Sequence, residues 1–61
     1  MNMTKTYQVY WMNFGYFSGE TFKNALDAIA YIKSKGFEGA VWDENNDLVA
    51  THTIFGGTRW Y

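Results

Sequence analysis

The period at which hydrophobic and polar residues repeat changes along the chain, and each period predicts an element. Residues Thr6–Met12 alternate between two faces, with Tyr7, Val9 and Trp11 on one of them, which is typical of a β-strand. The Asn and Gly residues that follow suit a tight connection, and Tyr16–Phe22 is the predicted return strand. We therefore expect the chain to begin with a β-hairpin.

A helical period of 3.6 residues begins at Ala25 and continues to Lys35. Asn24 is a good N-cap, and Gly36 is well placed to end the helix. The apolar positions form one broad arc, which consists of Ala25, Leu26, Ala28, Ile29, Ala30 and Ile32. A helix this short is not stable alone in water, so we expect Leu26 and Ile29 to face a sheet. The opposite side is expected to carry Asp27, Tyr31, Ser34 and Lys35.

Two more strands are predicted, over Phe37–Asp43 and Leu48–Phe55. The turn between them is rich in Asp and Asn, and Asn46 stands where a left-handed residue is commonly needed. The order β-β-α-β-β predicts an α+β fold, with a four-stranded antiparallel sheet in the order 2-1-3-4 and the helix on one face. The single domain spans residues 1–61, and residues 1–5 and 56–61 are expected to be loose ends.

Composition limits the class of protein. The chain has 61 residues, is 48% hydrophobic and contains no cysteine, so an ordered small domain without disulfides is expected. A net charge of −1 does not favour nucleic acid or an anionic membrane. The chain shows neither a signal peptide nor a run of apolar residues long enough to span a membrane. We expect a cytoplasmic protein that has no cofactor and does not bind membranes.

Candidate catalytic and metal sites are weak. His52 is the only histidine and lies in a predicted strand, where a hydrogen-bonded structural role is the commoner one. Asp43, Asn45 and Asp47 copy the first half of a calcium-binding loop. That loop needs glycine at its sixth position and glutamate at its twelfth, where this chain has Leu48 and Ile54. The sequence therefore predicts neither an enzyme nor a metal site.

Aromatic residues make up 21% of the chain, more than a small two-layer core can bury. The large side chains left over in the predicted arrangement are Tyr10, Met12, Phe14, Tyr16, Trp42, Trp60 and Tyr61. Exposed aromatic and methionine side chains are typical of protein interfaces. We expect a protein partner to contact Tyr10, Met12 and Trp42 on the sheet face away from the helix, together with Trp60 and Tyr61.

Two other interpretations of the same aromatic residues stay open. The uncovered sheet face could stack the bases of a single-stranded nucleic acid, although the balance of charge weighs against this. The chain could also be a small homodimeric structural protein that covers its own aromatic surface.

The hairpin Tyr7–Phe22, the run Glu20–Ala30 and the entry Gly36–Glu38 into the third strand resemble small phage proteins that inhibit a host protein. Such proteins include inhibitors of bacterial RNA polymerase and anti-CRISPR proteins. The resemblance implies a protein that binds and inhibits a protein partner, and it assigns no functional residue. Gly15–Ser18, followed by an alanine-rich helix and Gly36–Phe37, is also similar to half of a peptidoglycan-binding SPOR domain.

Overall fold

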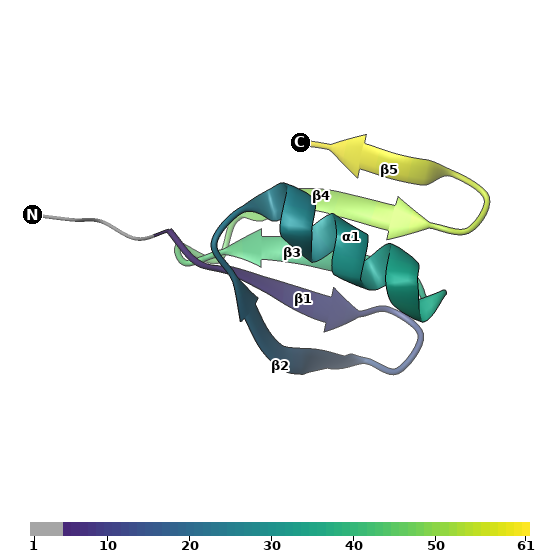
Figure 1. The fold of residues 1–61 in the computed structure, drawn as a ribbon, viewed down its shortest axis with the longest axis horizontal. Coiled ribbons are helices and arrows are strands. Elements are labelled where there is room, and N and C mark those ends of the chain that lie inside the picture. Colours follow the sequence, from purple (N-terminus) through teal and green to yellow (C-terminus); the bar gives the residue numbers. More distant parts are fainter. Residues whose placement is uncertain (1–4) are drawn as a thin grey trace, which may run out of the picture.

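The computed structural model describes residues 5–61; residues 1–4, part of one expected loose end, lie outside the described residues. One helix covers one face of a five-stranded antiparallel sheet, which makes the fold α+β as predicted (Figure 1). The elements are β1 (Tyr7–Trp11), β2 (Tyr16–Phe22), α1 (Ala25–Lys35), β3 (Gly39–Asp43), β4 (Leu48–Thr53) and β5 (Gly57–Trp60). Among these residues, no helix is both long enough and apolar enough to cross a membrane.

The strand order is β2-β1-β3-β4-β5, so the predicted order 2-1-3-4 is confirmed and the predicted strand count is one too few. Residues 56–61 were expected to be loose, but they supply the edge strand β5. Strand β4 ends at Thr53 rather than Phe55, and a positive φ of 71° at Gly57 lets the chain turn back into β5. The pairing continues beyond β5, because the Tyr61 N–H donates to the Val49 carbonyl at 2.8 Å.

Helix α1 begins and ends where the sequence predicts. The Asn24 side-chain oxygen accepts a hydrogen bond from the backbone N–H of Asp27 at 2.8 Å, which satisfies a free donor of the first turn. Gly36 has a φ of 72°, and its N–H donates to the Lys33 carbonyl at 3.1 Å. Both caps are local, which explains why sequence alone was sufficient to place the helix ends.

The core lies between the helix and the centre of the sheet. Its buried residues are Val9, Trp11, Ala28, Ile29, Ile32, Val41 and Ala50. Gly39 of β3 lies directly under the helix, because a Cβ atom at this position would stand 2.9 Å from Ile32 Cδ1. The absence of a side chain at residue 39 thus lets α1 approach the sheet closely.

The rotation of α1 differs from the prediction at two positions. Leu26, expected to face the sheet, is 70% exposed, whereas Tyr31, expected on the outer side, is half-buried. The Tyr31 ring lies 5.5 Å from that of Trp11 and 5.1 Å from that of Phe22. The helix therefore turns its larger aromatic side chain toward the aromatic rings of β1 and β2, which buries more apolar area than Leu26 would.

Candidate protein-binding surface

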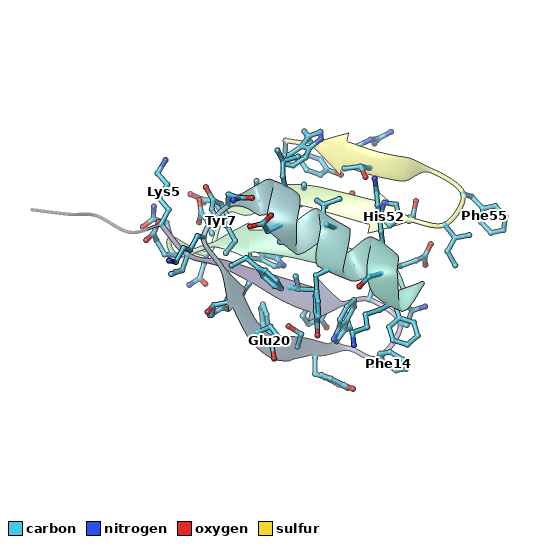
Figure 2. The ribbon with its side chains drawn as sticks, in the orientation of Figure 1. Lys5, Tyr7, Phe14, Glu20, His52 and Phe55 are labelled. Carbon is cyan, nitrogen blue, oxygen red and sulfur yellow. The ribbon has the colours of Figure 1, made fainter. Side chains whose placement is uncertain are left out.

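Three connections lie at the same end of the sheet, opposite the N-terminus: β1 to β2, α1 to β3, and β4 to β5 (Figure 1). Figure 2 shows Phe14 and Phe55, from the first and the last of these connections, at this end. Together with Tyr16 at the start of β2, the connections carry exposed apolar side chains that we call the loop end: Met12, Phe14, Tyr16, Phe37, Ile54 and Phe55. Loops normally carry polar residues at the surface, so this concentration of apolar residues needs an explanation.

Glu38 joins the connections of the loop end to one another. Its carbonyl accepts a hydrogen bond from the Met12 N–H at 3.0 Å, and its own N–H donates to the Asn13 side chain at 2.6 Å. On the other side, the Glu38 carboxylate accepts a hydrogen bond from the Ile54 N–H at 2.9 Å. Through one residue, the β1–β2 and β4–β5 connections are held against the start of β3.

Aromatic packing orders part of the loop end. The Phe14 ring meets that of Phe37 edge to face at 5.0 Å and stacks on that of Tyr16 at 5.9 Å. Phe37 in turn meets the buried Trp11 ring at 5.6 Å, which anchors the exposed rings to the core. Because one side of each ring is already packed, a partner that covered the other side would order little additional side-chain freedom.

Phe55 is different, because it is 100% exposed at the tip of the β4–β5 turn. Its neighbour Ile54 is 63% exposed. The turn itself is closed by a hydrogen bond from the Gly56 N–H to the Thr53 hydroxyl at 2.9 Å. The structure thus presents a large apolar side chain on a defined turn with nothing packed against it.

The residues predicted to bind a partner lie on three different surfaces. Trp42 pairs with Gln8, and Tyr10 pairs with Ala40, which places both aromatic side chains on the sheet face away from α1. Tyr61 borders a shallow pocket of that face with Thr51 and Arg59. Met12 belongs to the loop end. Trp60 is opposite the core residue Ala50, so it lies on the helix side.

Sequence reasoning recognised Phe14 and Tyr16 as surplus aromatic residues but missed Ile54 and Phe55. The two-residue alternation that begins at Leu48 continues through Phe55, so both residues read as part of a strand. The only signal of a turn was the Gly56–Gly57 pair. Whether that pair ended the fold or turned the chain into another strand depended on β5, which has no strong pattern of its own.

The residues considered for chemistry make local hydrogen bonds. His52 Nδ1 lies 3.0 Å from the Thr58 hydroxyl on the neighbouring strand. Asp43 Oδ1 accepts hydrogen bonds from the N–H groups of Asn45 and Asp47, each at 2.9 Å, in a turn where Asn46 has a φ of 64°. In residues 5–61, no three His, Asp or Glu side chains gather as the ligands of a metal ion would.

Comparison with known proteins finds no matching family, no similar curated protein and no similar solved structure. The argument for function therefore rests on the surfaces of this chain.

Proposed function

We propose that this protein is a non-enzymatic binding module that recognises a protein partner through the loop end and inhibits the partner by occupying its surface. The observation that supports this most directly is the gathering of exposed apolar side chains on connections that hydrogen bonds hold in place. From their exposed fractions and typical side-chain areas, the loop end presents roughly 700 Å². The largest apolar patch of an ordinary monomer is about 300–600 Å², whereas one side of a standard interface is about 800 Å².

The composition of the loop end also favours a protein partner. It consists of Phe, Tyr, Met and Ile, without a charged side chain, and aromatic residues and Met are enriched at the centres of interfaces, where charged residues are depleted. Phe55 is suited to act as an anchor, since a protruding ring that enters a pocket on the partner loses contact with water on all sides.

The open sheet face supports a second candidate, a single-stranded nucleic acid. Tyr10 and Phe17 meet edge to face at 5.1 Å on adjacent strands, and Trp42 lies on the same face. Bases could stack on these rings, and Arg59 could contact a phosphate. The net charge of −1 argues for the protein partner instead, since few counterions would be released.

The experiment is a comparison of matched baits in an extract of the native cell, and of the host if the protein comes from a phage. The baits are the wild type, the double variant Phe14→Ser with Phe55→Ser, and the control Leu26→Ser. Leu26 is as exposed as Ile54 but lies at the start of α1, at the other end of the molecule. We expect one protein to be retained by the wild type and the control and lost by the double variant.

Two results would contradict this proposal. One is the recovery of the same proteins by all three baits, and the other is the recovery of nucleic acid that salt removes, which would support the open sheet face instead.

A further inference from the structure

The hydrophobic core is small for a domain that must fold without covalent help. Of its buried residues, those larger than alanine are Val9, Trp11, Ile29, Ile32 and Val41. The chain has no cysteine for a disulfide, and the described residues form no metal-binding group. Domains of this size without such staples commonly gain stability from oligomerisation. A second copy of the chain is the one partner that is always available to provide it.

We propose that two copies of this chain bind each other through their loop ends about a two-fold axis. The inference rests on the proposed function of that surface and names its occupant. Two loop ends of roughly 700 Å² each would bury about 1,400 Å², which lies within the range of about 1,200–2,000 Å² of stable interfaces. The area available thus matches what a dimer needs.

The shapes and charges of the loop end suit a symmetric contact. In a two-fold dimer, each surface must complement itself, so a projecting group on one copy needs a receiving group on the other. Phe55 projects, and the packed rings of Phe14 and Phe37 offer a flat apolar area to receive it, so the contact occurs twice. Since no residue of the loop end is charged, closing the interface places no unpaired charge from this surface out of water.

Pairing of the sheet edges is a poorer route to a dimer. The β2 edge is interrupted by a register shift opposite Gly19, whose φ is 86°. The β5 edge has only four residues and carries Arg59. Bulges, short length and charge are devices that discourage pairing between edge strands. The loop end remains the largest apolar surface that lacks such a device.

Sedimentation equilibrium over micromolar to millimolar concentrations tests the proposal. We expect the wild type to dimerise and Phe55→Gln to weaken the dimer about thirtyfold, as an interface anchor does. Ile54→Gln should also weaken the dimer, whereas its matched control Leu26→Gln should leave the dissociation constant unchanged. Circular dichroism at low concentration checks that each variant keeps the fold of the monomer.

Cross-linking then locates the contact. Because the chain has no cysteine, Phe55→Cys and Phe14→Cys variants can be mixed and joined by a short bis-maleimide. We expect this pair to cross-link efficiently, and a mixture of Phe55→Cys with Leu26→Cys to cross-link only at the background rate.

Three outcomes overturn the proposal: a wild type that stays monomeric at millimolar concentration, a dimer that Leu26→Gln weakens as much as Ile54→Gln, and equal cross-linking of the two mixtures. Failure here is distinct from failure of the proposed function. If the wild type is monomeric but the Phe14→Ser, Phe55→Ser bait loses a protein that the Leu26→Ser bait retains, the loop end binds a different protein.

Discussion

The carboxylate of Glu38 accepts a hydrogen bond from the backbone N–H of Ile54 at 2.9 Å, which joins two connections that are 16 residues apart in sequence. The backbone of Glu38 also bonds to Met12 and to the Asn13 side chain. Glu38 is therefore a positioning residue of the loop end, since it holds the turn that presents Phe55 without itself adding apolar surface.

Replacement of Glu38 should loosen this turn. Glu38→Ala removes the acceptor of the Ile54 N–H, and we expect a loss of about 1 kcal/mol of unfolding free energy. The amide of Ile54 should exchange its hydrogen faster, which nuclear magnetic resonance measures residue by residue. Glu38→Gln keeps a side-chain oxygen and should lie between the two. Unchanged exchange at Ile54 in Glu38→Ala would mean that the carboxylate does not hold the turn.

The rotation of α1 predicts unequal effects for its two large aliphatic residues near the N-terminus. Ile29 is buried, so Ile29→Ala should cost about 2–5 kcal/mol and Ile29→Val about 0.5–1.5 kcal/mol. Leu26→Ala should change stability by less than about 0.5 kcal/mol, because Leu26 is exposed. Urea denaturation measures all three. If Leu26→Ala destabilises as much as Ile29→Ala, the helix is rotated differently.

Gly39 should tolerate no side chain beneath the helix. Gly39→Ala places a methyl group 2.9 Å from Ile32 Cδ1, and we expect a loss of about 1–3 kcal/mol. Ile32→Val removes that Cδ1 atom, so the double variant should be more stable than the sum of the single effects predicts. Additive effects in this double-mutant cycle would show that the cost of Gly39→Ala has another source.

Removal of residues 58–61 should destabilise the domain rather than trim a loose end. The deletion removes most of β5 and the Tyr61 hydrogen bond to Val49, and it uncovers the edge of β4. We expect a lower melting temperature and stronger aggregation, since a freshly exposed strand edge pairs with other chains. A shortened chain that melts with the wild type and stays clear in solution would contradict the place of β5 in the sheet.

Much of the fold could be read from local patterns. The caps at Asn24 and Gly36, the left-handed residue Asn46 and the antiparallel order of the first four strands all follow from preferences of neighbouring residues and short connections. The sequence also showed that more aromatic residues are present than a core can hold, and it named Met12, Phe14 and Tyr16 among the surplus.

Only the tertiary structure decided the rest, because the deciding contacts join residues that are distant in sequence. Leu26 and Tyr31 were both compatible with the helical period, and the rings of Trp11 and Phe22 determined which of them turned inward. Strand β5 exists because the edge of β4 offers it hydrogen bonds, and it converts Ile54 and Phe55 from strand residues into a turn. The hydrophobic alternation of a segment tells which faces it has, but the meeting of three connections at one end depends on how the whole sheet is assembled.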